Sequence, residues 1–352
     1  MVLPRFPLVF GIVTTYRCPL ACAHCCFQCG PRRREEIDPA KVAVAIQTLS
    51  RVSDVRCVAF TGGEPLLLKS LPELISIASS FGMATRIVTS AYWAVSRRAA
   101  ENKIDMLVRA GLNELNISTG DCHSKFVPVE HVCQAAVTGA LAGLRTLVVV
   151  EHWKRGVIDK QTILEIIKDK MNGRRPVHPV MVMENQIVPQ GYDFLPSSSQ
   201  PLGHIKTSSE YRGCNNVLLN LSLVPTGELY ACCGLTMREI PELQVGTIDD
   251  LQRQDSAESF FRFYNANSLW HLLATEGPED MARFVESEIG TKILEDGMQH
   301  RCHQCVALFS HPLSRPVLRE RLLREKDILL MKTLQQQCVF AGVEGLFNEG
   351  RD

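Results

Sequence analysis

The sequence of 352 residues lacks a long hydrophobic run, an excess of charge of one sign and an export signal. No segment reaches the ~18 apolar residues that a membrane-spanning helix requires, so no membrane span is expected. The 38 basic residues balance the 38 acidic ones, which gives no indication of binding to nucleic acid or to an anionic membrane. The apolar start at residues 1–13 has no basic segment and is interrupted by Pro and Arg. It therefore predicts a buried strand rather than a signal peptide.

Cysteine, in contrast, is abundant, with 14 in the chain. Disulfide frameworks belong mostly to small secreted proteins, whereas this chain is large and has no export signal. Metal ligation is therefore the better explanation for the cysteines. It predicts a reducing, cytoplasmic environment and sensitivity to oxygen.

In the first half of the chain, short β-rich segments alternate with helical patterns. The predicted strands are residues 8–13, 56–60, 85–89, 114–118, 145–150 and 178–184. A helix between each successive pair implies a parallel sheet with right-handed crossovers. Asp38 and Pro39 are typical of a helix N-cap and first helical position. The expected fold class is α/β, a partial (β/α)6 barrel of the TIM type.

The second half has a different pattern. Residues 195–209 are rich in Pro, Ser and Gly and predict a linker or long loop. Residues 214–234 look like a hairpin around the turn Pro225-Thr226-Gly227, and a charged helix is expected from about Arg315 to Gln337. We therefore expect three units: a barrel at 1–195, a second domain at 196–312 and a helical extension at 313–352.

Polar motifs follow the predicted strands of the first half. They include TGGEP at 61–65, TSAYW at 89–93, STGDCH at 118–123 and EHW at 151–153. In barrels of this kind the chemistry gathers at the carboxyl ends of the strands. We therefore expect these segments to surround a single mouth.

The densest motif is RCPLACAHCCFQCG at residues 17–30. The spacing C-x3-C-x2-C fits it twice, as Cys18, Cys22 and Cys25 or as Cys22, Cys26 and Cys29. Three thiolates on one short loop can hold three irons of a [4Fe–4S] cluster, which leaves the fourth iron without a protein ligand. A structural zinc site is the competing interpretation of the spacing.

Residues 14–25, TTYRCPLACAHC, resemble the cluster motif of the radical S-adenosylmethionine (radical SAM) superfamily. Pro19-Leu20 after the first cysteine and His24 before the third favour Cys18, Cys22 and Cys25 as ligands, so Cys26 and Cys29 are left without that role. The resemblance extends to GGEP, formed by Gly62, Gly63, Glu64 and Pro65. In the family this loop binds the amino group of SAM by its backbone and the acidic residue. Both motifs together argue against zinc.

The resemblance implies the rest of the cofactor site. SAM would be cleaved on the cluster to a 5′-deoxyadenosyl radical, which takes a hydrogen atom from the substrate. By position, Ser118 and either Thr89 or Ser90 would contact the ribose and carboxylate of SAM. Gln190 and Gly191, in VPQGYD, would contact the adenine, although Tyr192 stands where the family often has Arg. Simple capping of strand ends is the alternative for each.

The C-terminal cysteines resemble the auxiliary-cluster domains called twitch and SPASM. There are too few for the seven-cysteine SPASM form, so the resemblance implies the shorter twitch form with a second [4Fe–4S] cluster. Its expected ligands are Cys214, Cys232, Cys302 and Cys305.

Cys233 is then left over beside a ligand and should face a different direction on an extended strand. A thiol can return a hydrogen atom to a carbon radical, and the radical SAM peptide epimerases, which this layout resembles, use a cysteine in that role. Cys233 is therefore the candidate catalytic donor. The alternatives are a small buried apolar residue, or a cluster ligand in place of Cys232.

The leading hypothesis is an enzyme that epimerizes a Cα of a ribosomal precursor peptide from L to D. The expected partners are that peptide and an electron donor such as flavodoxin or ferredoxin. The alternatives are peptide crosslinking through a thioether or carbon–carbon bond, with the auxiliary cluster as electron acceptor, and modification of a sugar or other small molecule. A non-catalytic electron-transfer or sensor protein is also considered, but it would not need GGEP. Since Cys18 lies so near the start, we expect leader binding to use the barrel, the twitch region or another protein.

Overall fold

The computed structural model describes residues 7–152, 156–186, 212–295, 298 and 300–325. Within these residues, nine strands form one sheet in the order β6-β5-β4-β3-β2-β1-β7-β8-β9. The order places the first strand of the chain near the middle of the sheet, between strands from the two halves of the sequence.

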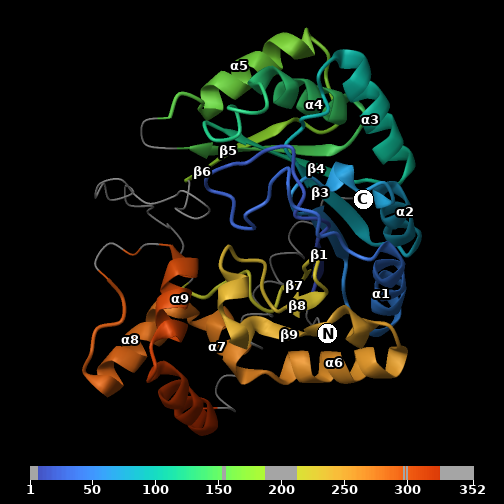
Figure 1. The fold of residues 1–352 in the computed structure, drawn as a ribbon. Coiled ribbons are helices and arrows are strands. Elements are labelled where there is room, and N and C mark those ends of the chain that lie inside the picture. The colour runs from blue at the N-terminus through green and yellow to red at the C-terminus, as the bar shows by residue number, and fades with distance from the viewer. Residues whose placement is uncertain (1–6, 153–155, 187–211, 296–297, 299, 326–352) are drawn as a thin grey trace, which may run out of the picture.

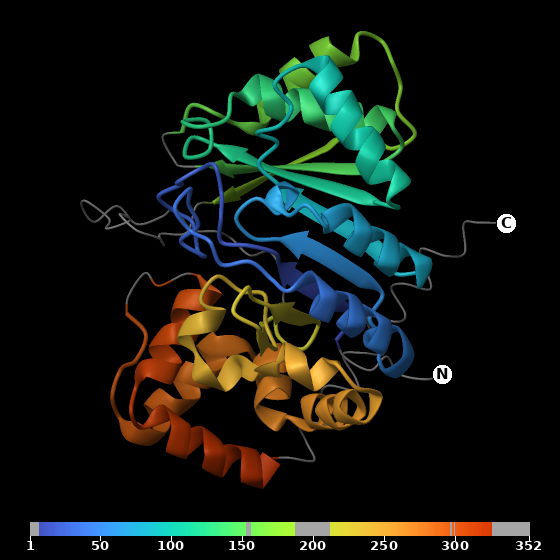
Figure 2. The same ribbon diagram turned by 45° about the vertical axis from the view of Figure 1, so that its right-hand side comes forward.

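The first six strands are parallel neighbours in sequence order, which confirms the predicted α/β partial barrel. These strands are β1 (Val9–Val13), β2 (Cys57–Thr61), β3 (Ala84–Thr89), β4 (Glu114–Gly120), β5 (Arg145–His152) and β6 (Met181–Gln186). A helix follows each of the first five: α1 (Pro39–Val52), α2 (Leu71–Ser80), α3 (Arg97–Arg109), α4 (Val129–Leu141) and α5 (Lys160–Met171). Figures 1 and 2 show these helices along the outer side of the sheet, which leaves its inner side to the loops.

The start of α1 illustrates how the sequence determines these boundaries. The carboxylate of Asp38 accepts hydrogen bonds from the backbone N–H groups of Ala40 and Lys41, and Pro39 takes the first helical position. An N-cap of this kind satisfies donors that have no partner inside the helix, so the predicted helix start is confirmed.

The predicted hairpin is present as β7 (Asn220–Leu223) and β8 (Glu228–Tyr230), and β9 (Gln244–Thr247) adds a third antiparallel strand. The sequence did not indicate how this hairpin attaches to the barrel. Strand β7 pairs in parallel with β1, so that Val9 lies between Cys57 and Asn220. The sheet is therefore continuous from the barrel into the C-terminal half.

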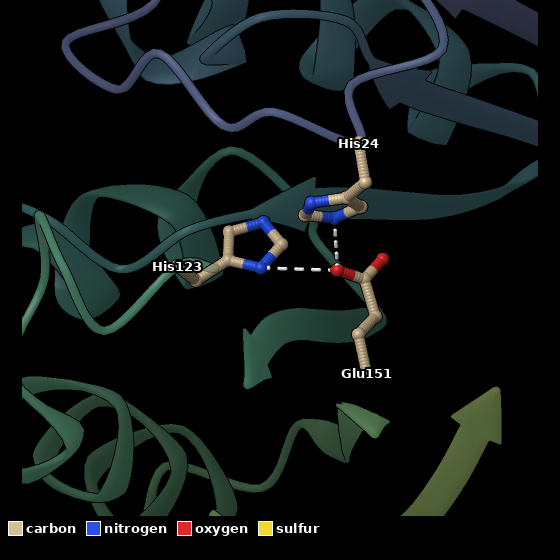
Figure 3. A group of neighbouring side chains, drawn as sticks. All are labelled: His24, His123 and Glu151. Atoms are coloured by element: carbon tan, nitrogen blue, oxygen red, sulfur yellow. Dashed lines mark ion pairs between the residues drawn. The ribbon is translucent and has the colours of Figure 1, made fainter. Parts of the chain in front are cut away.

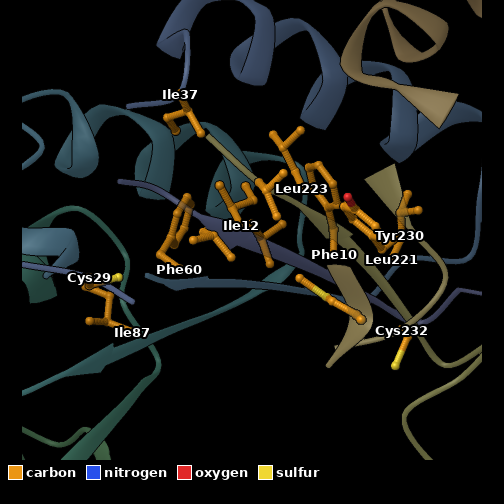
Figure 4. Packing of buried hydrophobic residues seen from close by; sticks show 14 of the residues in the cluster. Phe10, Ile12, Cys29, Ile37, Phe60, Ile87, Leu221, Leu223, Tyr230 and Cys232 are labelled. Atoms are coloured by element: carbon orange, nitrogen blue, oxygen red, sulfur yellow. The ribbon is translucent and has the colours of Figure 1, made fainter. Parts of the chain in front are cut away.

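The hydrophobic core follows the same path (Figure 4). Phe10 and Ile12 of β1 are completely buried, between Phe60 of β2 on one side and the β7 residues Leu221 and Leu223 on the other. Burying one side chain of this size contributes about 1.5–3 kcal/mol. The apolar contacts of β1 thus join the two halves of the chain.

The C-terminal half is otherwise helical. It contains α6 (Gln254–Ala266), α7 (Ser268–Thr275), α8 (Gly277–Ile289) and α9 (Arg301–Ser310), and residues 314–325 are also helical. The predicted linker at 195–209 and the end of the charged helix beyond residue 325 lie outside the described residues. Among the residues that the structure describes, no helix is long and apolar enough to cross a membrane.

Candidate functional site

A cavity of about 520 Å³ lies at the carboxyl ends of the barrel strands. All five cysteines of the loop at residues 17–30 line it, namely Cys18, Cys22, Cys25, Cys26 and Cys29. Residues at or just after the carboxyl ends of β2, β3, β4 and β5 line it as well, among them Gly62, Ser90 and Glu151. The single mouth expected from the sequence is therefore present.

The cysteine loop is closed at its base by backbone hydrogen bonds. Cys18 N donates to Gly30 O (3.2 Å), and Gly30 N donates to Tyr16 O (3.1 Å). Burial raises the pKa of the Cys18 thiol to about 12. Within the loop, the backbone N–H of Cys29 points at Cys25 Sγ (3.4 Å), and hydrogen bonding with Cys29 lowers the pKa of Cys25 to about 6. Cys29, which the sequence left without a role, is thus a hydrogen-bonding neighbour of Cys25.

The glycines of GGEP hold the cysteine loop against β2. Gly63 N donates to Thr15 O (2.7 Å), and Glu64 N donates to Arg17 O (3.0 Å). A Cβ on Gly63 would lie 2.2 Å from Arg17 O, and Gly62 has a φ of +132°. A side chain at either position would displace the backbone on which the cysteines are mounted.

Glu64 is completely buried, and its carboxylate is engaged within the protein. It accepts hydrogen bonds from Thr89 Oγ1 (2.7 Å), Ser90 Oγ (2.7 Å) and Ser90 N (3.0 Å). Burial raises the pKa of Glu64, although these hydrogen bonds act in the opposite direction. The acidic residue of GGEP therefore ties β2 to β3.

The residues expected to contact SAM lie in three different settings. Gly62, Gly63, Thr89, Ser90 and Ser118 line the cavity. Glu64 and Pro65 are buried behind it, and Pro65 begins a one-turn helix, η1 (Pro65–Leu67). Gln190 and Gly191 lie outside the described residues.

Three polar side chains that the sequence did not connect meet in the cavity wall (Figure 3). Glu151, at the end of β5, forms an ion pair with His24 from the cysteine loop. It forms a second ion pair with His123, from the segment after β4, in which Glu151 Oε2 lies 3.1 Å from His123 Nδ1. The two rings are 5.0 Å apart, edge to face. The only sequence signal was that His123 and Glu151 follow neighbouring strands.

The charges in this group support one another. Burial opposes the charge of Glu151, but hydrogen bonds from His123 and His24 lower its pKa to about 2. Burial alone would lower the pKa of His24, yet hydrogen bonds with Cys122 and Glu151 raise it to about 10. The group therefore fastens the cysteine loop to the ends of β4 and β5.

Arg238, from the C-terminal half, fastens the other side of the loop. Its guanidinium lies over the rings of Tyr16 (5.2 Å) and Phe27 (5.7 Å). It also donates to Tyr16 Oη and to Cys26 O, both at 3.3 Å. Nothing in the sequence pattern indicated this contact, because its partners are more than 200 residues away.

A second cavity, of about 720 Å³, adjoins the first. Cys214, Cys232, Cys302 and Cys305 all line it, so the structure brings together the four cysteines expected as auxiliary ligands. Cys214 precedes β7, Cys232 follows β8, and the other two lie on the first turns of α9. Burial is the main cause that raises the pKa of Cys232, and the neighbouring sulfurs of Cys214 and Cys302 raise it further.

The wall between the cavities is thin. Four residues line both cavities, namely Asn216, Gly234, His300 and Cys302. A Cβ on Gly234 would lie 3.1 Å from both Cys232 Sγ and Cys302 Sγ, so glycine leaves the room these two sulfurs occupy. Consecutive residues face different cavities, because Cys232 lines only the second and Cys233 only the first. Cys233 is exposed toward the first cavity, but desolvation by the surrounding protein atoms raises the pKa of its thiol to about 12.

Comparison with known proteins assigns a family to the first part of the barrel. Residues 12–122 match the family described as the Radical SAM superfamily. This part of the chain is a radical SAM domain. The match includes the cysteine loop, GGEP and the ends of the first four strands, which supply part of the lining of the first cavity.

Curated relatives share this part of the radical SAM domain. The PqqA peptide cyclase of Xanthomonas euvesicatoria pv. vesicatoria is 34% identical over 116 residues, which are 33% of this chain and 30% of the relative. The GTP 3′,8-cyclase of Chlorobaculum tepidum is 35% identical over 108 residues, which are 30% of this chain and 31% of the relative. The chain thus spans about 30% of the length of the curated relatives it matches.

One solved structure resembles nearly the whole chain. Native anSMEcpe with bound AdoMet and Cp18Cys peptide superimposes with a TM-score of 0.51, covering 94% of this chain and 99% of that one. The sequence identity is 11%, so the likeness concerns the fold alone.

A radical SAM domain implies a [4Fe–4S] cluster and SAM, and the first cavity fits both. All five thiols of the cysteine loop line it, including the three expected ligands, and thiolates are the ligands that iron–sulfur clusters require. Because Gly62 and Gly63 have no side chains, only their backbone atoms border the cavity. Cys18, Cys22 and Cys25 would hold the cluster, and the polar rim of Thr89, Ser90 and Ser118 would surround SAM.

Proposed function

We propose that this protein is a radical SAM enzyme that converts an L residue of a ribosomally made peptide to its D form, with Cys233 as the hydrogen donor. The observation that carries this proposal is the placement of two consecutive cysteines. Cys233 lines the same cavity as Cys18, Cys22 and Cys25, while its neighbour Cys232 lines the adjoining one.

The cluster and SAM, when bound, supply one-electron chemistry that removes a hydrogen atom from the substrate Cα. The protein's part begins with the carbon radical that results. The S–H bond of Cys233 breaks and a new C–H bond forms on the opposite face of Cα. One electron from a reduced carrier, such as flavodoxin or ferredoxin, and one proton from water then return Cys233 to the thiol. Desolvation by the cavity walls favours the neutral thiol that this role requires.

We further propose that Cys214, Cys232, Cys302 and Cys305 hold a second [4Fe–4S] cluster. Support comes from their common cavity and from the proximity of their sulfurs. Thiolates close together in a buried space repel one another, and bound metal compensates that repulsion. Cys233, on the other side of the wall, remains a free thiol.

A peptide substrate is supported by the relatives. One curated relative is named a peptide cyclase, and the structure that resembles this chain in fold has a peptide bound. The cavity is also lined by residues from both halves of the chain, including Cys233, Leu235 and His300 beside the barrel residues. A peptide residue entering it would meet the proposed donor from one side and the SAM site from the other.

The test is a reaction with SAM, dithionite and a candidate precursor peptide in deuterated water. Epimerization exchanges one Cα hydrogen for solvent deuterium, because the thiol hydrogen exchanges with the solvent. Cys233→Ala should abolish the D residue and the deuterium in the peptide, while 5′-deoxyadenosine is still produced. Full D-residue yield from Cys233→Ala would overturn the assignment of the donor.

Peptide crosslinking is the second candidate function. The observation in its favour is the thin wall between the cavities, since an auxiliary cluster held by Cys302 would lie close enough to accept the electron of a product radical. A crosslinked peptide loses two hydrogens and takes up no deuterium at Cα. Its formation would be unaffected by Cys233→Ala, so the same reaction separates the two functions.

A further inference from the structure

The Cys233 thiol has a specific hydrogen-bond partner in the wall between the two cavities. The S–H group of Cys233 donates to Asn216 Oδ1, with 3.6 Å between sulfur and oxygen. Asn216 lines both cavities, whereas Cys233 lines only the first. The contact between the thiol and the amide therefore lies in the wall that separates the two cavities.

The backbone fixes this pair. Leu218 N donates to Ala231 O (3.2 Å), at a point two residues after Asn216 and two residues before Cys233. Leu218 lies in the turn at residues 215–219 and has a φ of +66°, so this hydrogen bond ties the turn that carries Asn216 to the chain just before Cys233. Asn220 Nδ2 also donates to Asn216 O (3.2 Å), and Val217 is buried, so the backbone next to the amide is held in place. The contact is thus built into the entry of the hairpin.

We propose that Asn216 is a positioning residue that sets the resting direction of the Cys233 S–H bond. This inference rests on the proposed role of Cys233 as hydrogen donor. A thiol hydrogen that is bonded to an amide oxygen points at that oxygen and is not directed into the open cavity. An S–H group without the acceptor rotates about its Cβ–Sγ bond and samples the cavity.

The consequence is protection of the enzyme between turnovers. In a cavity that also holds SAM, a freely rotating S–H group is a hydrogen source for any reactive carbon, including that of the cofactor. The weak S–H···O bond keeps the hydrogen occupied, yet costs little to break when a substrate radical forms beside it. Asn216 thus favours transfer to substrate over wasteful transfer to the cofactor.

The first experiment measures the thiol directly, without turnover. The infrared S–H stretch of Cys233 is isolated in the anaerobic, cluster-loaded protein by subtracting the spectrum of Cys233→Ala. Hydrogen bonding lowers this frequency, so Asn216→Ala should raise it, and Asn216→Asp, which keeps an acceptor oxygen, should restore a lower value. Asn102→Ala, at an exposed residue of α3 that lines neither cavity, is the control and should leave the band unchanged.

The second experiment uses SAM and dithionite in deuterated water without peptide. Asn216→Ala should increase the fraction of 5′-deoxyadenosine that carries solvent deuterium several-fold over wild type. The increase should disappear in the double variant Asn216→Ala, Cys233→Ala. Iron content and far-ultraviolet circular dichroism verify that each variant is folded and loaded.

Two results would overturn the inference: an S–H band that does not move in Asn216→Ala, or excess deuterium that persists in the double variant. Failure of the donor assignment itself has a different signature. In that case Cys233→Ala retains its full yield of D residue with peptide, whatever the S–H band does in Asn216→Ala.

Discussion

Cys232 and Cys233 are consecutive residues that line two different cavities. Both lie just after β8, and Gly234, the next residue, leaves room for the sulfurs of Cys232 and Cys302 in the second cavity. One short segment therefore contributes to both proposed centres, and a pair of single substitutions can separate their roles.

Iron content should respond differently to the two substitutions. We expect about eight iron atoms per chain in the anaerobically reconstituted protein, which corresponds to two [4Fe–4S] clusters. Cys232→Ala should lower the content to about four, because it removes a ligand of the second cluster only. Cys233→Ala should leave it unchanged, which makes it the matched control. Equal loss in both variants, or zinc in place of the second four irons, would contradict the ligand assignment.

Gly63→Ala should disrupt the first cavity. The new Cβ would lie 2.2 Å from Arg17 O, so the backbone that carries the cysteine loop must move. We expect loss of the first cluster and of SAM binding, measured by iron content and equilibrium dialysis. Gly30→Ala, at the end of the same loop, is the control because its Cβ would meet no atom within 4 Å. Normal SAM binding by Gly63→Ala would refute the packing argument.

Glu64→Gln should destabilise the fold. The amide nitrogen of Gln cannot accept hydrogen bonds, so a donor on Thr89 or Ser90 loses its partner in a completely buried place. An unsatisfied buried donor costs about 1–3 kcal/mol, which urea denaturation can measure. The exposed Glu73 on α2 provides the control Glu73→Gln, for which no change is expected. A stability equal to wild type would mean that Glu64 does not depend on these bonds.

Arg238→Ala should loosen the cysteine loop from the C-terminal half. The substitution removes the contacts with Tyr16 and Phe27 and the bond to Cys26 O. We expect a chelator to extract iron from the first cluster several-fold faster, with the iron content before extraction unchanged. Arg238→Lys keeps the charge but not the planar stack and should be intermediate. The exposed Arg253 provides the control Arg253→Ala. If the chelator extracted iron from Arg238→Ala as slowly as from wild type, Arg238 would not hold the cysteine loop in place.

His271 should make stability depend on pH. It is buried in α7, with its Nε2 at 2.7 Å from Asn265 O, and burial lowers its pKa below the ordinary 6.5. The unfolded chain therefore binds a proton more readily than the folded one, so stability is full above pH 6.5 and falls as the pH drops below it. Between pH 7.5 and 5.5 the free energy of unfolding should therefore fall more than it does in His271→Gln, as measured by urea denaturation at each pH. Parallel pH profiles for the two proteins would contradict this expectation.

The sequence predicted the barrel because each of its strands and helices is specified locally. Asp38 caps its own helix, and each strand pairs with the next one along the chain. The mouth was predictable for the same reason, since parallel strands bring their carboxyl ends together. The cysteine loop was predictable because its three expected ligands lie within eight residues of one another.

The remaining features depend on contacts between distant residues. The pairing of β7 with β1 and the contact of Arg238 with Tyr16 join segments more than 200 residues apart, and no local pattern records them. The meeting of His24 with Glu151 depends on side-chain direction as well as on strand order. The role of Glu64 in tying β2 to β3 likewise depends on the fold, because Thr89 and Ser90 approach it only once the sheet has formed.

The position of β1 between β2 and β7 has a consequence for synthesis of the protein. During translation, the first strand can pair with β2 early, but its other edge stays open until residues 220–223 have emerged. An open strand edge is a template for association with other chains. A fragment ending after β6 would keep the cysteine loop and GGEP yet expose that edge permanently. The second edge of β1 is thus covered only once β7, the last parallel strand, has formed.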